Sequence, residues 1–511
     1  MLHRIKPFLF LTACLAAGSV HAQQTAGKDN TKTLIVFFDG LRPDYITPET
    51  MPNLYAFSRR GCYGKSHHSV FPTVTRVNSS SYSTGCYPAK NGLMGNTVYF
   101  PQVDKTKGLN TGEAADLNRA NEATHGRLLT AVTLGELLQA AGARMMVFSS
   151  GSTGQALLQN HTVSGGAIVN PDMILPASFK ATVINDIGAI PPAGKPNAAR
   201  HAWVTDALMK YGLQPNGPQV SSIWFSDPDG AAHSDGIGSP KAMESIRAVD
   251  QQFGRIIDSL ERRGLSPYFN ILVSTDHGFV THVGKQGVTE FLIAQGLKKE
   301  KESEDVVVAE GAIYVKDHDA ALIQKIVTAL QSQEWIGAVF TKGSHPGDMK
   351  GTVPGTLSFE SIHWNNPDRA GDILVDMNWD DRKNDKGYAG TGFARGVAGH
   401  GGMSPYEVHI ALLAAGPGFK KAYQDTLPTS NVDITPTVLR LQHIPIPATM
   451  DGRPLEELFA GQPGAAPGAV KKETIETEVK YPGGVYRLSL QRTVMGSRQY
   501  VDYSTVTRKA D

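Results

Sequence analysis

Three hydrophobic runs in the sequence are each followed within a few positions by an aspartate. The runs cover residues 33–38, 223–225 and 271–273, and the aspartates are Asp39, Asp229 and Asp276. Short hydrophobic runs that end in turn residues are typical of strands buried on both faces. In an open parallel α/β sheet, the loops at the carboxyl ends of the strands meet at one edge, where ligands bind. We therefore expect the three carboxylates to lie close together at that edge.

Three histidines accompany these carboxylates. His277 directly follows Asp276, His233 follows Asp229 by four positions, and His400 lies in a glycine-rich loop, GHGG. Each feature alone is common in turns or on surfaces, but the convergence of four separate segments favours a shared site. Carboxylate oxygens and imidazole nitrogens together suit two zinc-like ions. The sequence therefore predicts a two-metal site.

A hydrolytic metal site also needs a nucleophile, and the segment 71–85 offers two threonines. Thr75 lies at the start of a short predicted helix that ends at Gly85. The helix N-terminus and, far more, coordination to a metal would favour the ionised hydroxyl of Thr75. Plain N-capping is the alternative role for Thr75, and Thr73 is the rival candidate nucleophile.

The elements around these residues predict an α/β fold. Residues 145–148 and 409–414 are further candidate strands, and amphipathic helical patterns such as 246–260 lie between the strands. Strands that alternate with helices indicate a parallel sheet covered on both faces.

Several segments interrupt or extend this pattern. A strand, an amphipathic helix and a second strand over 311–343 indicate a small α+β insertion. The poorly periodic stretches at about 96–130 and 165–200 indicate long surface insertions. Residues 461–470 have the composition of a linker, and 485–503 has the pattern of a terminal β-hairpin.

The composition of the chain is that of an ordinary globular protein. The chain has 511 residues, of which 41% are hydrophobic and 19% charged, which excludes a disordered, collagen-like or coiled-coil protein. The 49 Lys and Arg residues against 48 Asp and Glu residues leave a formal charge of +1. No bulk basic field for binding nucleic acid therefore exists, and function must depend on particular sites.

The first 22 residues have the pattern of a secretory signal peptide. Arg4 and Lys6 precede an apolar stretch, and small residues lead to a predicted cleavage site after Ala22. Lipoprotein processing at Cys14 is an alternative. No later apolar run is long enough to span a bilayer. We therefore expect a periplasmic or secreted protein.

Two cysteines, Cys62 and Cys86, would remain after cleavage of the signal peptide. An oxidising compartment would permit a disulfide between them. Burial as two small hydrophobic residues is the equal alternative.

The order of the motifs resembles the alkaline phosphatase superfamily, and within it the nucleotide pyrophosphatase/phosphodiesterase family, from about residue 33 to 455. The matching segments are 38–45, 51–54, Thr75 with 84–85, 229–233, 274–278, 399–401, 433–437 and 451–452. The resemblance implies an alkaline-phosphatase-like three-layer α/β sandwich with a mostly parallel central sheet. It implies a catalytic domain at 31–460 that carries a small α+β subdomain at about 281–400. The linker and hairpin patterns described above add a C-terminal β-hairpin extension at 471–511.

The resemblance also implies roles for individual residues. It assigns one zinc ion to Asp229, His233 and His400, and the other to Asp39, Thr75, Asp276 and His277. Thr75 would attack phosphorus and form a phosphothreonine that water then hydrolyses. Asn96 would donate to a phosphoryl oxygen, helped by the backbone N–H after the nucleophile, and Asn78 matches a further asparagine of the family that contacts substrate.

Some positions depart from the family pattern. Many members have an aromatic residue after the nucleophile, where this chain has Arg76. A guanidinium there could pair with a second phosphate, a carboxylate or a monoester dianion, or it could point to solvent. Asn91 stands where histidine is common and Asp227 where glutamate is common. Residues 86–90 resemble the sulfatase signature, but Thr75 holds the nucleophile position, which excludes that family.

We therefore expect an exported, two-zinc phosphodiesterase or nucleotide pyrophosphatase that acts on a small phosphate-containing substrate such as a nucleotide. A phosphomonoesterase or phosphonate hydrolase on the same site is the first alternative. A catalytically silent binding protein with structural metals is the second.

Overall fold

The structure is a computed structural model that describes residues 31–463 and 470–510. The predicted signal peptide lies outside the described residues, as does most of the predicted linker. None of the described helices is both long enough and apolar enough to cross a membrane.

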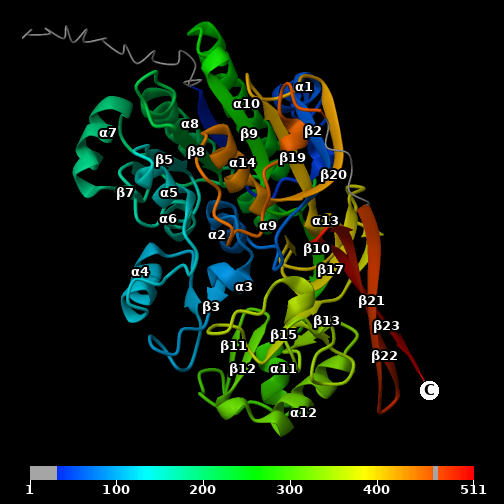
Figure 1. Cartoon of the computed structure of the whole chain (residues 1–511). Helices are drawn as coiled ribbons and strands as arrows, with labels where there is room; N and C mark the ends of the chain where they lie inside the picture. The colour runs from blue at the N-terminus through cyan, green and yellow to red at the C-terminus, as the bar shows by residue number, and fades with distance from the viewer. Residues whose placement is uncertain (1–30, 464–469, 511) are drawn as a thin grey trace, which may run out of the picture. The chain divides into compact units, whose positions relative to one another are not determined.

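A nine-stranded sheet lies at the centre of the fold (Figure 1). Its five inner strands are parallel and are, in spatial order, β9 (Phe269–Thr275), β1 (Lys32–Phe38), β8 (Val220–Phe225), β5 (Met145–Ser149) and β6 (Ala167–Asn170). The outer strands are β7 (Met173–Leu175) beside β6, and β19 (His409–Ala415), β2 (Cys62–His68) and β20 (Tyr423–Ser430) beyond β9. The predicted α/β fold with a mostly parallel sheet is confirmed.

Both faces of the sheet are apolar and covered by helices. In β1, Ile35 and Phe37 belong to one hydrophobic cluster, whereas Leu34, Val36 and Phe38 belong to another. Successive side chains of a strand point to opposite faces, so the two clusters lie on opposite sides of the sheet. Helices α2 (Thr75–Thr84), α6 (Thr153–Gln159) and α14 (Ile434–Leu441) contribute to the first cluster, and α1 (Pro52–Arg60), α8 (Ala198–Ala207) and α10 (Pro240–Arg262) to the second. The result is the expected three-layer arrangement.

The register of the central strands brings their last residues to one edge. Phe38 of β1 pairs with Phe225 of β8 on one side and with Thr275 of β9 on the other. The loops that follow these three strands therefore start side by side. They carry the three aspartates that the sequence singled out.

A smaller α+β unit follows β9 in the sequence. Its five-stranded sheet contains β11 (Val306–Ala309), β12 (Ala312–Val315), β15 (Ile373–Met377), β13 (Ile336–Thr341) and β14 (Leu357–Ser358), with α12 (Ala320–Gln331) between β12 and β13. The predicted strand–helix–strand unit of 311–343 is thus present. A second small sheet holds β16 (Trp379–Lys383), β17 (Ala389–Arg395), β10 (Val280–Gly284) and β18 (Ala398–Gly399), and β18 leads directly into His400.

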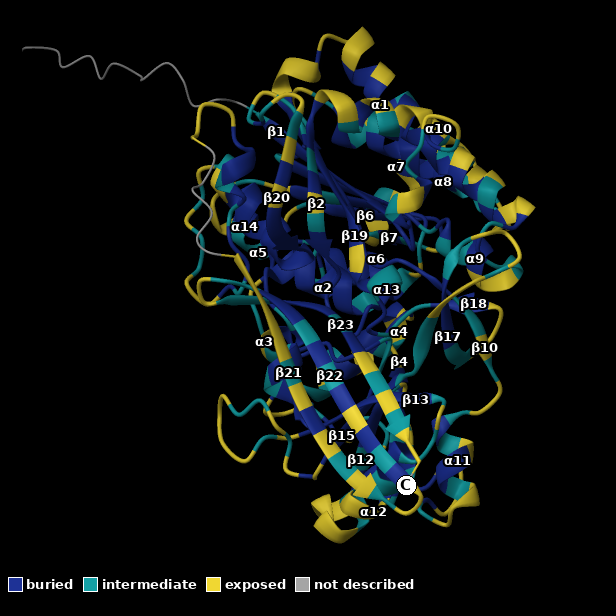
Figure 2. Ribbon diagram, turned by 90° about the vertical axis from the view of Figure 1, so that its right-hand side faces the viewer, coloured by how far each residue is buried: buried dark blue, intermediate teal, exposed yellow. Residues whose placement is uncertain are grey.

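The C-terminal extension is a three-stranded antiparallel sheet. The expected hairpin corresponds to β22 (Gly484–Met495) and β23 (Arg498–Lys509), and β21 (Val470–Tyr481) adds a third strand. Figure 2 shows that β21 is largely exposed, whereas buried residues of β22 alternate with less buried ones. Tyr486 donates a hydrogen bond of 2.9 Å to the Gly337 carbonyl of the small unit, and Ser504 N–H donates to the Met403 carbonyl at 3.1 Å. The extension therefore joins the small unit to the loop that follows His400.

One expectation needs correction, and one open alternative is decided. Residues 165–200 are not simply a surface insertion, because β6 and β7 extend the central sheet. These strands are too short to show a clear period in the sequence, which is why the pattern gave no sign of them. Cys62 and Cys86 form no disulfide but are two buried free thiols, whose pKa burial raises to about 12.

A buried aspartate fastens the C-terminal sheet to the central sheet. Asp502 of β23 is 2% exposed, and its Oδ1 lies 3.0 Å from Nε2 of His68 on β2 and 3.5 Å from Nε2 of His409 on β19. Its Oδ2 lies 2.8 Å from the Thr493 hydroxyl and 3.1 Å from the Lys472 ammonium. Burial alone would raise the pKa of Asp502, but hydrogen bonds from the two imidazoles hold it far below the usual range. The side chain is therefore an ionised carboxylate with a complete set of partners.

We predict that Asp502→Ala lowers the free energy of unfolding by about 3 kcal/mol, because it leaves buried polar partners without their carboxylate. Urea denaturation followed by fluorescence measures the effect. Asp385→Ala is the matched control, since that side chain is 81% exposed. A loss in Asp502→Ala no larger than in the control would contradict the assigned role.

Candidate active site

The first candidate metal group joins α9 to the loop after β18. Helix α9 (Asp229–Asp235) places Asp229 and His233 on the same face, one turn apart, and Asp229 Oδ2 lies 3.1 Å from Nε2 of His233. The same oxygen lies 3.4 Å from Nε2 of His400. His233 and His400 lie 4 and 171 positions after Asp229 in the sequence, yet the structure brings the three residues together. This grouping was predicted from the residue types.

The second candidate group lies at the ends of β1 and β9. His277 Nε2 is 3.1 Å from Asp276 Oδ2 and 3.6 Å from Asp39 Oδ1. The Thr75 hydroxyl oxygen lies 3.2 Å from His277 Nε2 and 3.5 Å from Asp39 Oδ1. Stacking of the His277 and His400 rings, with centroids 3.4 Å apart, joins the two groups. All seven predicted metal-site residues thus lie in one place.

The backbone determines which nitrogen of each imidazole faces the carboxylates. Nδ1 of His233, His277 and His400 lies within 3.0 Å of the carbonyls of Ala398, Gly278 and Thr73, respectively. A carbonyl only accepts hydrogen bonds, so each Nδ1 must carry the proton and donate. In the neutral ring, each Nε2 then presents a lone pair, which is the tautomer that binds metal ions.

Buried negative charge dominates the electrostatics. Burial raises the pKa of Asp39 well above its usual range, and the charges of Asp276 and Asp229 raise it further. Burial would also raise the pKa of Asp229, but the facing His233 and His400 outweigh burial and hold it well below the usual range. Burial, followed by the repulsion that a protonated His277 would exert, lowers the pKa of His400 to about 4. The carboxylates and imidazoles of the two candidate metal groups therefore lack balancing positive charge, which divalent cations would supply.

Helix α2 aims the Thr75 hydroxyl at this group. Thr75 is the first residue of α2, and no side chain caps the helix, so the N-capping alternative for Thr75 is wrong. The rival Thr73 is not available, because its hydroxyl donates to the Gly402 carbonyl at 2.8 Å and accepts from Gly401 N–H at 3.1 Å. Gly85 ends the helix as expected, with a φ of +65°. Thr75 is thus the hydroxyl that faces the carboxylates.

Asn96 lies beside the start of α2, with one difference from expectation. Its Oδ1 accepts the Arg76 backbone N–H at 3.1 Å, so that N–H is engaged by Asn96 instead of being free for a phosphoryl oxygen. Asn96 N–H in turn donates at 2.7 Å to Glu310, which lies in the turn between β11 and β12. Glu310 was missed from the sequence, because a contact across 214 positions leaves no local pattern. The small unit therefore helps to position Asn96.

Asn78 does not reach the substrate side of the site. It is fully buried, and its Nδ2 donates to the carbonyls of Val70 and Val74. Its Oδ1 accepts from Val70 N–H at 2.9 Å and from the Asn431 amide at 2.9 Å. All its hydrogen-bonding capacity is used, so the prediction of a substrate contact is wrong. Asn78 instead holds the segment that leads to Thr75.

Two buried carboxyl groups that sequence reasoning missed support the loop after His400. Glu407 accepts from Gly402 N–H at 2.8 Å, and Asp376 accepts from Met403 N–H at 3.1 Å. A Cβ on Gly402 would lie 3.0–3.2 Å from their oxygens, so a larger residue there would force these carboxyl groups to shift. Burial raises the pKa of both carboxyl groups, that of Asp376 well above its usual range.

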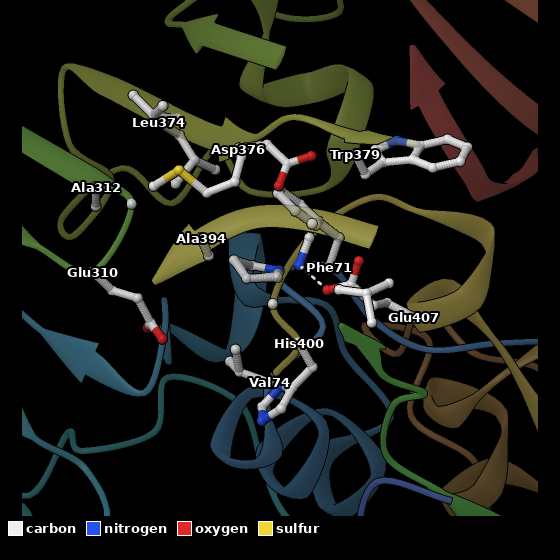
Figure 3. Close-up of a pocket in the computed structure, with 18 of the residues that line it drawn as sticks. Phe71, Val74, Glu310, Ala312, Leu374, Asp376, Trp379, Ala394, His400 and Glu407 are labelled. Atoms are coloured by element: carbon white, nitrogen blue, oxygen red, sulfur yellow. Dashed lines mark hydrogen bonds between the residues drawn. The ribbon is translucent and has the colours of Figure 1, made fainter. Parts of the chain in front are cut away.

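These carboxyl groups also line a largely apolar cavity of about 260 Å³ next to His400 (Figure 3). Phe71, Val74, Leu374 and Trp379 are among its walls. The cavity lies between the candidate metal ligand His400 and the small α+β unit. It is large enough for a small organic group.

A second cavity, of about 240 Å³, contacts Asp39, Thr75 and Asp229. Arg76 lines it and is only partly exposed. Arg76 therefore faces this cavity and keeps some contact with solvent. The candidate site thus has two cavities of different chemistry, one lined by Thr75 and the other by Val74 and His400.

Comparisons with curated proteins identify ectoenzymes of one family. The chain is 26% identical over 265 residues to mouse ectonucleotide pyrophosphatase/phosphodiesterase family member 3, a match that covers 51% of this chain and 26% of that protein. It is 25% identical over 271 residues to human family member 7, with 53% of this chain and 52% of that protein covered. The chain thus spans about a quarter and about half of these relatives.

Solved structures share the fold at low sequence identity. Murine ectonucleotide pyrophosphatase/phosphodiesterase 5 superposes with a TM-score of 0.58 at 18% identity, covering 84% of this chain and 100% of the other. Alkaline phosphatase PafA superposes with a TM-score of 0.63 at 16% identity, covering 84% and 99%. The alkaline-phosphatase-like fold is therefore confirmed. The model of the type I phosphodiesterase/nucleotide pyrophosphatase family matches residues 33–386, and the chain belongs to that family.

Proposed function

We propose that this protein is an exported, zinc-dependent phosphodiesterase or nucleotide pyrophosphatase that acts through a phosphothreonine on Thr75. The observation that carries the proposal is the orientation of the three imidazoles, whose Nε2 atoms face carboxylates beside the Thr75 hydroxyl. Family membership supports the reaction class. The murine relative, an inactive threonine-to-alanine variant in complex with AMP, supports nucleotides among the substrates. The signal-peptide pattern of residues 1–22 supports export to the periplasm or beyond.

The donor set fits two zinc ions. Asp229, His233 and His400 would hold one ion, and Asp39, Thr75, Asp276 and His277 the other. Among the described residues, Asp229 Oδ2 and Asp276 Oδ2 are buried oxygens without a hydrogen-bond donor, which is expected of oxygens reserved for a cation. When bound, such ions favour the ionised hydroxyl of the nucleophile and neutralise developing charge on the phosphoryl oxygens.

The protein's own residues then position the reacting groups. Thr75 supplies the attacking oxygen, and the positive end of the α2 dipole favours the negative phosphoryl group in front of it. Asn96 uses Oδ1 for the Arg76 N–H, which leaves its Nδ2 to donate to a phosphoryl oxygen. Water hydrolyses the phosphothreonine in the second half of the reaction. Thr73 fixes His400 through its carbonyl, which keeps the imidazole from rotating.

A phosphomonoesterase or phosphonate hydrolase on the same site is the second candidate. Arg76 favours it, because a guanidinium beside Thr75 could pair with the extra negative charge of a monoester. The apolar cavity beside His400 favours a diester instead, since it offers space for an organic substituent. A catalytically silent binding protein is disfavoured by the complete set of candidate ligands.

We predict that kcat/KM for bis-p-nitrophenyl phosphate exceeds that for p-nitrophenyl phosphate by about tenfold or more, because the diester can also fill the apolar cavity. Steady-state rates with zinc-loaded protein measure both values. A preference for the monoester would reject the diesterase and favour the second candidate.

We also predict that Thr75→Ala lowers kcat for bis-p-nitrophenyl phosphate by at least about 10³-fold, because the variant lacks the nucleophile. Thr75→Ser keeps a hydroxyl and should retain measurable turnover, with a phosphoserine trapped by rapid acid quench. Thr73→Ala is the control for the rival hydroxyl. The Thr73 hydroxyl is hydrogen-bonded to the backbone of residues 401 and 402, so it is not available as the nucleophile. Full activity in Thr75→Ala would show that the nucleophile is another group.

A further inference from the structure

The cavity of about 240 Å³ beside Thr75 contains two cationic side chains. Arg76 lines it from the first turn of α2, and Lys195 lines it from the segment that precedes α8. Among the described residues, no aromatic side chain lines this cavity. Its chemistry therefore differs from that of the apolar cavity beside His400.

The carboxylates in the same wall already have partners. Asp39 and Asp229 belong to the candidate metal groups. Asp227 accepts from Nε2 of His201 at 2.9 Å and from Asn197 N–H at 2.8 Å. None of the three is paired with either cation, so the positive charge in the cavity is not cancelled by an ion pair within 4.0 Å in the described chain.

The Arg76 guanidinium forms no ion pair within 4.0 Å in the described chain. It is only partly exposed, and its Nε is buried with no hydrogen-bond partner in the described chain. The nearby carboxyl group is that of Glu310. Burial raises its pKa and the positive charge of Arg76 lowers it, but the two side chains form no ion pair within 4.0 Å. A buried guanidinium N–H without an acceptor is costly unless a ligand supplies one.

The segment that carries Lys195 is tied to the loop that carries Asp229. Asn197 donates its backbone N–H to Asp227 and its side-chain amide to the Ser226 hydroxyl at 3.1 Å. Ser226 and Asp227 lie three and two positions before Asp229, in the segment that follows β8. Lys195 is therefore kept at the rim of the site by the same loop that supplies a candidate metal ligand, whereas its own side chain is exposed.

We propose that Arg76 and Lys195 form a subsite for a second anionic group on the substrate, a phosphate or a carboxylate carried by one of the ester substituents. The proposal rests on the proposed function, because it assumes that a phosphoryl group binds at Thr75. Arg76 would supply a planar pair of donors and Lys195 a point charge, a combination that suits either anion. The preferred substrate then carries negative charge beyond the phosphoryl group that is attacked.

Isothermal titration calorimetry with zinc-loaded full-length protein tests this without relying on turnover. Three phosphonates of equal chain length serve as probes: propylphosphonate, 3-phosphonopropionate and propane-1,3-bisphosphonate. They share the group that would bind at Thr75 and differ in a neutral, carboxylate or phosphonate tail. We expect the better of the two anionic tails to bind about tenfold or more tightly than the neutral tail, and the better tail identifies the anion.

Variants assign the preference to the two cations. Lys195→Gln and Arg76→Gln should each reduce the ratio of anionic-tail to neutral-tail affinity at least about fivefold, whereas Lys195→Arg should retain it. Lys180→Gln, at an exposed lysine at the start of α7 (Lys180–Ile187), is the control and should leave the ratio unchanged.

Two results would overturn the proposal, and they are distinguishable. If wild-type protein binds propylphosphonate but shows no preference for either anionic tail, or keeps its preference in both glutamine variants, the subsite is wrong and the proposed function stands. If no phosphonate binds and bis-p-nitrophenyl phosphate is not hydrolysed, the proposed function fails, and the subsite fails with it.

Discussion

The crowding of three buried carboxylates at the edge of one sheet is the constraint on which the rest of the structure depends. Asp276 and Asp229 lie close enough to Asp39 to raise its pKa beyond the effect of burial, whereas the facing histidines lower the pKa values of Asp229 and Asp276. Imidazoles face each cluster through lone pairs, because backbone carbonyls hold their other nitrogens. Such an arrangement is costly in an empty protein and favourable around divalent cations.

The fold holds this cluster in place from several directions. The aligned ends of β1, β8 and β9 supply the carboxylates, and α2 supplies the hydroxyl. The small unit reaches the site through Glu310, which positions Asn96, and through Asp376, which holds the loop after His400. The C-terminal sheet contacts that same loop through Ser504. Segments far apart in the chain therefore converge on a few side chains whose exact placement decides function.

The sequence was most informative where chemistry and local pattern coincide. Hydrophobic runs that end in aspartate predicted β1, β8 and β9 with their ligands, and the helix start predicted the place of Thr75. The features that the sequence could not predict depend on contacts between residues far apart in the chain. Asn78 matches a family motif, yet its hydrogen bonds to Val70 and Asn431 are visible only in three dimensions. Glu310 and Lys195 lack a local signal, and β6 is too short to show a period.

The central claim is that this cluster holds two metal ions around Thr75. Anomalous diffraction at the zinc absorption edge, from crystals of zinc-loaded protein, tests it most directly. We expect two peaks about 4 Å apart, one among Asp229, His233 and His400 and the other among Asp39, Thr75, Asp276 and His277. Peaks absent from these groups, or found instead at His68, His409 and Asp502, the other described group with metal-binding residue types, would contradict it.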